Sequence, residues 1–188
     1  MNQQFAIYAG IVWLLWVLSW WIAAFWRARS TKQAPRASYR WQLMLAFLGF
    51  VLLFWRTPFP GQPWWSIGPV LGWALVGVVA TGAGFAWWAR IHLGALWSGA
   101  IEMREAHHIV DTGPYRLVRH PIYTGLILSA LGLAAIKATP LAMLGAALVA
   151  IGFALKAKAE ERFLTKELPD YPSYARRVPM LVPGIHIG

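Results

Sequence analysis

The stretch that decides the fold is the apolar run Phe5–Trp26, which reads FAIYAGIVWLLWVLSWWIAAFW. It contains no charged residue, and at a rise of about 1.5 Å per helical residue it is long enough to cross the roughly 30 Å hydrocarbon core of a bilayer. The run lacks the basic start and the small-residue cleavage site of a signal peptide. We therefore expect a retained membrane-spanning helix at this position.

Four further apolar runs follow, at Trp41–Trp55, Ile67–Ala89, Ile122–Ile136 and Leu141–Leu155. The last two are short, so they either span by borrowing flanking residues or form a hairpin that dips into the bilayer. Residues 156–188 are interpreted as a membrane-surface helix followed by an irregular segment. The pattern predicts an all-α integral membrane bundle of about five transmembrane helices. Residues 1–188 form one domain, with membrane helices in 1–89 and a functional core in 90–188.

Composition supports a chain that is solvated by lipid. Hydrophobic residues make up 59% of the sequence and charged residues only 13%, against about 25% charged residues in soluble domains. The net charge of +10 is spread between apolar runs rather than along one stripe, which indicates cytoplasmic loops and not a nucleic-acid surface. Cysteine is absent, which excludes disulfides and thiol nucleophiles.

The basic residues also predict an orientation. Under a five-span interpretation, fifteen Lys and Arg residues fall in 27–40, 90–121 and the segment from Lys156 onward, whereas Arg56 and Lys137 alone fall on the opposite side. By the positive-inside rule the N-terminus lies outside and both later polar regions are cytoplasmic. We expect a multi-pass protein whose active site faces the cytoplasm.

Polar chemistry is concentrated in His107–Gly125, which reads HHIVDTGPYRLVRHPIYTG. The proline that opens the following apolar run suits the first turn of a helix. The helix N-terminus, together with Arg116 and Arg119, is suited to hold a carboxylate or another anion. The alternative is that these basic residues contact lipid headgroups.

Two adjacent acids, Glu160 and Glu161, follow the last apolar run. Ionisable groups at the hydrocarbon boundary are costly and often functional, although Lys and Arg neighbours on the same helix offer a simpler partner. Acids and bases from two cytoplasmic segments together suit a pocket for a zwitterionic ligand. The histidines lack a convincing set of acidic ligands, so no metal site is expected.

Four blocks in order resemble the signature of the isoprenylcysteine carboxyl methyltransferase family. They are Gly113-Pro-Tyr115, Arg119-His-Pro-Ile-Tyr-Thr-Gly125, Glu160-Glu161 and Tyr171-x-x-Tyr174-x-x-Arg177-Val-Pro179. Related membrane phospholipid and thiol methyltransferases share much of this pattern. The resemblance covers roughly residues 107–183 and implies a membrane-embedded methyltransferase that uses S-adenosylmethionine.

The resemblance also implies which residues act. The cofactor pocket is expected to use His107, Ile109, Val110, Tyr115, His120, Pro121, Tyr123 and Glu160, and the catalytic group is expected to be Lys156, Glu160, Tyr174 and Arg177. Lys156 stands where the family has an arginine linked to the acceptor side. Lysine cannot make the planar bidentate contact that arginine makes with a carboxylate.

The resemblance implies a lipophilic methyl acceptor that reaches the site from the bilayer, with a prenylcysteine-type carboxylate as the first expectation. A phospholipid amine and a small thiol remain open as alternatives. A non-catalytic protein that binds lipid through its basic loops is the hypothesis of a different class.

Overall fold

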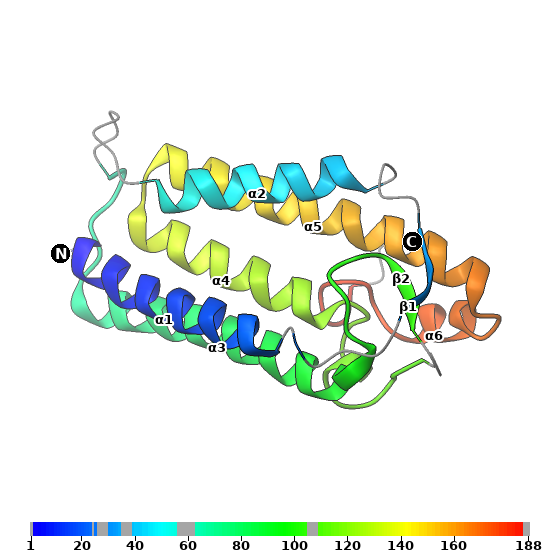
Figure 1. Ribbon diagram of the computed structural model, residues 1–188. Helices are drawn as coiled ribbons and strands as arrows, with labels where there is room; N and C mark the ends of the chain where they lie inside the picture. Colours follow the sequence, from blue (N-terminus) through cyan, green and yellow to red (C-terminus); the bar gives the residue numbers. More distant parts are fainter. Residues whose placement is uncertain are drawn as a thin grey trace.

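The computed structural model describes residues 2–23, 25, 30–34, 39–55, 63–104 and 109–185. These residues form six α-helices, which confirms the all-α prediction (Figure 1): α1 Asn2–Ala23, α2 Arg40–Phe54, α3 Pro69–Leu93, α4 Pro121–Lys137, α5 Pro140–Glu167 and α6 Tyr171–Arg177. Two short strands, β1 Ser30–Gln33 and β2 Glu102–Arg104, pair antiparallel at one end of the bundle.

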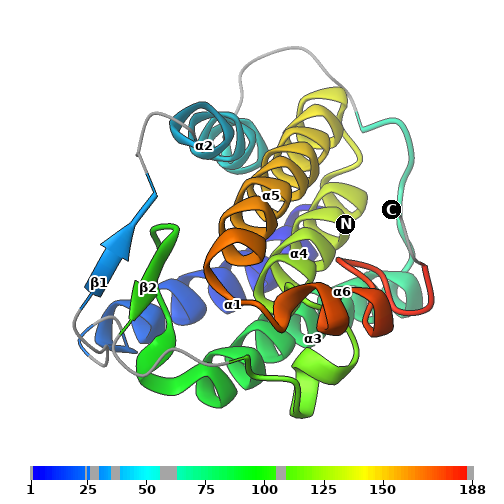
Figure 2. The same ribbon diagram turned by 90° about the vertical axis from the view of Figure 1, so that its right-hand side faces the viewer.

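Helix α4 lies at the centre of the bundle. It packs against α3 on one side and α5 on the other, α2 lies along α5, and α1 contacts both α3 and α4. Figure 2 views the bundle from the end where α6 and the two strands gather. The polar segments of the sequence therefore meet at this one end.

Small residues set the spacing between two pairs of helices. A Cβ on Gly125 of α4 would lie 2.4 Å from the carbonyl oxygen of Gly82 in α3, and a Cβ on Gly49 of α2 would lie 2.6 Å from the carbonyl oxygen of Gly145 in α5. Helices in lipid associate largely through such close van der Waals packing. Among the glycines of the third apolar run, Gly72 and Gly82 are closely packed in this way, whereas Gly68, Gly77 and Gly84 have nothing within 4 Å of the position that a Cβ would take.

Three helices, α1, α3 and α5, are long and apolar enough to cross a membrane. Helices α2 and α4 have 15 and 17 residues and are shorter apolar helices. Only 17% of the α1 span and 28% of the α3 span are buried inside the protein, as expected for surfaces that face lipid. The chain is therefore a membrane protein, and the number of its helices that span remains a prediction.

One expectation about α5 was wrong. The sequence suggested that the last apolar run ends near Leu155 and that a separate surface helix begins at Lys156, but α5 continues without a break to Glu167. Residues 156–167 contain no proline or glycine and are mainly good helix formers, so nothing ends the helix there. Lys156 and Glu160 consequently extend from the same rigid element as the span.

Candidate functional site

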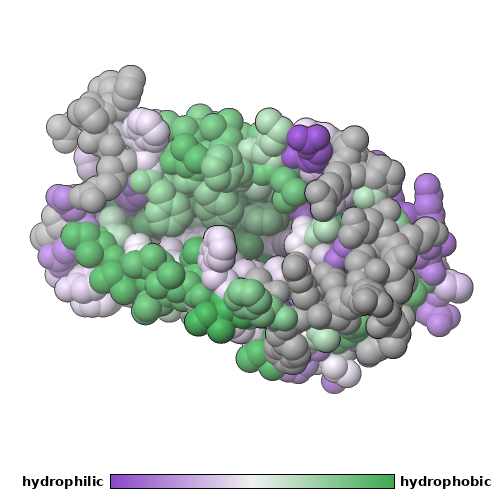
Figure 3. Space-filling view, viewed as in Figure 1, coloured by the Kyte–Doolittle hydropathy of each residue, from purple (hydrophilic) through white to green (hydrophobic). Residues whose placement is uncertain are grey.

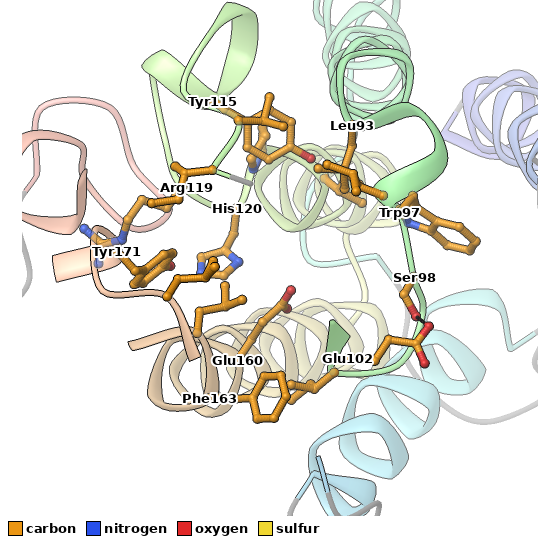
Figure 4. A pocket seen from close by; sticks show the side chains of 18 of the residues that line it. Leu93, Trp97, Ser98, Glu102, Tyr115, Arg119, His120, Glu160, Phe163 and Tyr171 are labelled. Atoms are coloured by element: carbon orange, nitrogen blue, oxygen red, sulfur yellow. Dashed lines mark hydrogen bonds between the residues drawn. The ribbon is translucent and has the colours of Figure 1, made fainter. Parts of the chain in front are cut away.

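A cavity lies at the polar end of the bundle, between the end of α3, the start of α4, the second half of α5 and helix α6. It holds about 890 Å³ of empty space, counting its open mouth. Figure 4 shows Glu160 pointing from α5 into the space that Tyr115, His120 and Trp97 surround. The wall is mostly apolar and aromatic, with few charged groups.

Arg119 and Glu161 form a bidentate ion pair beside the cavity. Nε of Arg119 donates to Oε1 of Glu161 at 2.6 Å, and Nη2 donates to Oε2 at 3.0 Å. The remaining Nη1 donates to the carbonyl oxygens of Ala175 and Val178. Burial by itself lowers the pKa of the Arg119 guanidinium, but the hydrogen bonds and charge of Glu161 outweigh it and raise that pKa above its ordinary value.

The same acid orients His120. Oε1 of Glu161 lies 3.1 Å from Nε2 of His120 and shares a hydrogen bond with it. The imidazole also stacks face to face on the ring of Tyr123, with 5.4 Å between ring centroids. A histidine held from two sides in this way presents a fixed edge to the cavity.

The segment after α6 is hydrogen-bonded to the start of α4 and fixes its position. The backbone N–H groups of Arg119 and His120 donate to the carbonyl oxygens of Pro179 and Met180 at 2.9 and 3.1 Å. One turn further, the Thr124 hydroxyl donates to the carbonyl oxygen of Leu181 at 2.7 Å. The Arg-His-Pro motif is therefore positioned by residues about sixty positions later in the chain.

Tyr123 forms hydrogen bonds with two charged side chains of α5, Glu160 and Lys156. Its hydroxyl donates to Oε2 of Glu160 at 2.7 Å and accepts from Nζ of Lys156 at 2.6 Å. The Lys156 ammonium also lies 4.8 Å from the centroid of the Tyr123 ring, a cation–π contact. The ring of Tyr123 also stacks on that of Phe153, at 5.1 Å between centroids.

Two further tyrosines close the side of the cavity nearest α6. The Tyr174 hydroxyl donates to the carbonyl oxygen of Tyr115 at 2.7 Å. Burial raises the pKa of both phenols, and the negative charge of Glu160 adds to the effect at Tyr115. Both side chains therefore stay neutral hydrogen-bond donors at physiological pH.

The opposite wall comes from residues 93–102, which the sequence analysis did not identify. Trp97 lies over the guanidinium of Arg90 at 4.7 Å and against Trp20 of α1 at 5.5 Å. Arg90 in turn donates through Nη2 to the carbonyl oxygen of Ala23, at the end of α1. Apart from Ser98 and Glu102, this wall is made of common apolar residues, and it contains no motif, so its main sequence signal was its position directly after a span.

The structure brings most of the predicted site residues to the cavity wall: Ile109, Val110, Tyr115, His120, Pro121, Tyr123, Glu160 and Tyr174. Lys156 lies buried behind Tyr123 and is not part of the wall. Arg177 is exposed, forms a 3.8 Å ion pair with Asp111 and does not reach the cavity. His107 lies outside the described residues. Among the residues that are described, no cluster of three His, Asp or Glu side chains is placed to hold a metal ion.

A second hollow opens on the apolar side of the bundle. It is lined by Gly10, Trp13, Leu14, Trp16 and Val17 of α1, Phe50 and Phe54 of α2, and Leu126 of α4. Figure 3 shows this face as a hydrophobic depression between α2 and α1. We call it the lateral groove.

Comparison with known proteins places the chain in a family. Residues 75–166 match the profile of the isoprenylcysteine carboxyl methyltransferase family. Protein-S-isoprenylcysteine O-methyltransferase B of Arabidopsis thaliana is 30% identical over 134 residues, which cover 68% of this chain and 66% of that protein. The chain belongs to the isoprenylcysteine carboxyl methyltransferase family. The profile begins within α3 and ends within α5, so it includes most of the cavity wall, whereas Leu168, Tyr171 and Tyr174 lie beyond it.

Two bacterial relatives carry other names. The cobalt-zinc-cadmium resistance protein CzcN of Cupriavidus metallidurans is 32% identical over 151 residues, 78% of this chain and 63% of that protein. Methanethiol S-methyltransferase 1 of Bradyrhizobium diazoefficiens is 30% identical over 178 residues, 84% of this chain and 58% of that protein. The chain thus spans less than two thirds of the length of either relative.

Proposed function

We propose that this chain is a multi-pass membrane methyltransferase that transfers a methyl group from S-adenosylmethionine to a lipophilic acceptor. The observation that carries the proposal is the cavity itself, in which the carboxylate of Glu160 projects into a largely apolar, aromatic space. Family membership supports the same chemistry. In that reaction the donor supplies an activated methyl group on a positively charged sulfur.

The residues on the wall fit such a donor. Glu160 is the anionic group suited to its positive end, because a carboxylate in a site of low polarity interacts strongly with a nearby cation. Tyr115 and Trp97 offer flat surfaces for a purine ring. His120, held by Glu161, offers a hydrogen-bonding edge.

The lateral groove is suited to the apolar part of the acceptor. Its Trp13 contacts Phe50 at 5.3 Å between centroids, Phe50 contacts Phe153 at 6.2 Å, and Phe153 stacks on Tyr123. A continuous set of aromatic contacts therefore leads from the lipid-facing groove to the wall of the cavity. We propose that the acceptor arrives from the bilayer and that the polar donor arrives at the open mouth, on the cytoplasmic side.

The experiment uses the full chain in proteoliposomes with donor labelled in its methyl group, and follows label that partitions into organic solvent. Two variants are compared, Glu160→Gln in the cavity and Asp170→Asn on the exposed turn before α6. We expect Glu160→Gln to lower transfer by at least about 100-fold, as for loss of a charged group at a reacting centre, and Asp170→Asn to act like the unaltered chain. Equal transfer by both variants, or no transfer into any lipid extract, contradicts the proposal.

A further inference from the structure

Lys156 is buried in α5, one helical turn before Glu160. Its side chain is 4% exposed, and it lies behind Tyr123 rather than on the wall of the cavity. Residues four positions apart lie on the same face of a helix, so Lys156 and Glu160 both reach Tyr123. A buried ammonium is costly unless other groups compensate its charge. The groups that compensate Lys156 therefore indicate its role.

The contacts of Lys156 converge on one side chain. Its ammonium donates to the Tyr123 hydroxyl at 2.6 Å and lies 4.8 Å from the centroid of the same ring. The Tyr123 hydroxyl in turn donates to Oε2 of Glu160 at 2.7 Å. The three groups thus form a chain of hydrogen bonds that runs from the interior of the bundle to the cavity, into which Glu160 points (Figure 4).

The direction of this chain follows from the hydrogen-bonding capacity of each group. An ammonium can only donate, an ionised carboxylate can only accept, and a phenol has one proton. Because Lys156 donates to its oxygen, the Tyr123 hydroxyl directs its own proton at Glu160. Lys156 therefore supplies a counter-charge to Glu160 through one phenol, and successive hydrogen bonds of this kind strengthen one another in an apolar setting.

Two further rings fix the ring of Tyr123. His120 stacks on it at 5.4 Å between centroids with 3° between the planes, and Phe153 stacks on it at 5.1 Å with 19°. The ring cannot turn away without losing these contacts. The position of the Tyr123 hydroxyl, and with it the orientation of the Glu160 carboxylate, is thus set before a ligand binds. Such preorganisation lowers the cost of binding.

We infer, on the basis of the methyl transfer proposed above, that Lys156 is a positioning residue for the donor. It acts through Tyr123 to orient the carboxylate of Glu160 toward the positively charged end of S-adenosylmethionine. The family resemblance implies an arginine linked to the acceptor side at this position. In this chain the lysine serves the donor side, because its ammonium is bonded to Tyr123 behind the cavity wall.

Ligands with and without a positive charge should respond differently to the loss of Lys156. S-adenosylhomocysteine carries an ammonium group at its amino-acid end. The compound 5′-methylthioadenosine shares its adenosine and thioether but has no charged group. A misoriented Glu160 weakens binding of the first ligand and leaves the second unaffected, whereas a lysine with a merely structural role would affect both.

The first test measures both ligands by calorimetry with the full chain in detergent. We expect Lys156→Met to weaken S-adenosylhomocysteine by at least about tenfold, through loss of a charge-assisted hydrogen-bond chain, and 5′-methylthioadenosine by less than about threefold. Lys158→Met is the matched control, because Lys158 is exposed on the same helix, and it should bind both ligands normally. Equal losses for the two ligands, or no loss for S-adenosylhomocysteine, overturn the inference.

The second test asks whether Lys156 acts through Tyr123. Tyr123→Phe removes the hydroxyl that joins the two charges and keeps the ring that stacks on His120 and Phe153. In this background Lys156→Met should weaken S-adenosylhomocysteine by less than about threefold, because the chain is already broken. A further loss equal to that in the unaltered chain would show that the two residues act independently and would overturn the route through Tyr123.

Lys156→Gln provides a second variant in case methionine prevents folding. The glutamine amide can donate to Tyr123 or accept from it, so the direction of the chain is no longer forced. Thermal unfolding without ligand establishes that each variant is folded. We expect folded Lys156→Gln to lose at least about threefold in affinity for S-adenosylhomocysteine and to keep its affinity for 5′-methylthioadenosine. Unchanged affinity for both ligands overturns the inference.

The unaltered chain separates failure of this inference from failure of the proposed function. If the folded, unaltered chain does not bind S-adenosylhomocysteine, the proposed function fails and the role of Lys156 fails with it. If that chain binds and Lys156→Met binds equally well, only the role of Lys156 is rejected, and the donor site around Glu160 stands.

Discussion

Arg119 joins three elements of the site through the hydrogen bonds of one side chain. Its guanidinium connects the start of α4 to Glu161 on α5 and to two carbonyls at the end of α6. Its side chain is 8% exposed and that of Glu161 is 19% exposed. At this burial the loss of one partner leaves the other charged and poorly solvated, so the pair matters more than a surface ion pair.

We therefore predict that Glu161→Gln destabilises the protein by about 3 kcal/mol, because Arg119 keeps its charge and loses its counter-ion. Urea or thermal unfolding in detergent measures the change. The exposed pair between Arg177 and Asp111 is the control, since Arg177→Ala should cost less than about 1 kcal/mol. Similar losses in both variants would show that the Arg119 pair contributes no more than a surface contact.

At the scale of elements, the crossing of α3 and α4 determines where Tyr123 and His120 lie relative to the wall at Trp97. The contact at Gly82 and Gly125 brings the two backbones together and leaves no room for a Cβ. Gly84 lies two residues further along α3, is exposed, and has nothing within 4 Å of the position that a Cβ would take. Gly125 and Gly84 thus differ in packing although both lie in apolar helices.

We predict opposite signs for the two alanine substitutions. Gly125→Ala should destabilise by about 1–3 kcal/mol, because α3 and α4 must move apart. Gly84→Ala should stabilise by about 0.5–1 kcal/mol, since alanine loses less backbone freedom than glycine in a helix. Thermal midpoints of the two purified variants decide it; destabilisation by both, or by neither, would contradict the packing described here.

The elements were predictable where hydrophobicity alone defines them. The expected run Trp41–Trp55 corresponds to α2, and Ile122–Ile136 corresponds to α4, each within a residue. The length of α5 was not predictable from hydropathy, because most residues beyond Lys156 are polar. The apolar residues among them pack against parts of the chain that are distant in sequence, Tyr39 and Ile101 on one side and α6 on the other. The wall at Trp97 was not predicted, because an apolar residue directly after a span looks like part of that span. The sequence does not show that Trp97 contacts Arg90 and Trp20.

Candidate site residues were predictable where the motif fixes the local chain. His120, Pro121 and Tyr123 lie on one helical start and reach the cavity together. Arg177 follows Tyr174 by three residues on α6, yet the short helix turns Tyr174 inward and leaves Arg177 in solvent with Asp111. Spacing along the sequence could not reveal which face of α6 is buried.

At the scale of the whole molecule, the polar end and its cavity should face the cytoplasm. The described basic residues outside the α-helices lie at the site end (Figure 1): Lys32 of β1, Arg104 of β2, Arg116 and Arg119. Lys137 lies at the other end and donates to the carbonyl oxygens of Leu53 and Trp55. A bundle with this asymmetry inserts with its basic end inside.

A pair of reporter fusions measures this orientation. We predict a cytoplasmic signal from a reporter fused after the full chain and an external signal from one fused after Lys137, under the five-span arrangement. A cytoplasmic signal from the fusion after Lys137 would reject that arrangement. A signal from the full-length fusion on the outer side would reject the cytoplasmic site.

The central claim is that the cavity around Glu160 and His120 binds the methyl donor, and calorimetry with S-adenosylhomocysteine tests it most directly. The full chain in detergent should bind one equivalent, Glu160→Ala and His120→Ala should each weaken binding by at least about tenfold through loss of a hydrogen-bonding or charged contact, and Lys158→Ala should bind normally. Absence of heat from the unaltered, folded chain, or equal affinity in all four proteins, would contradict the claim.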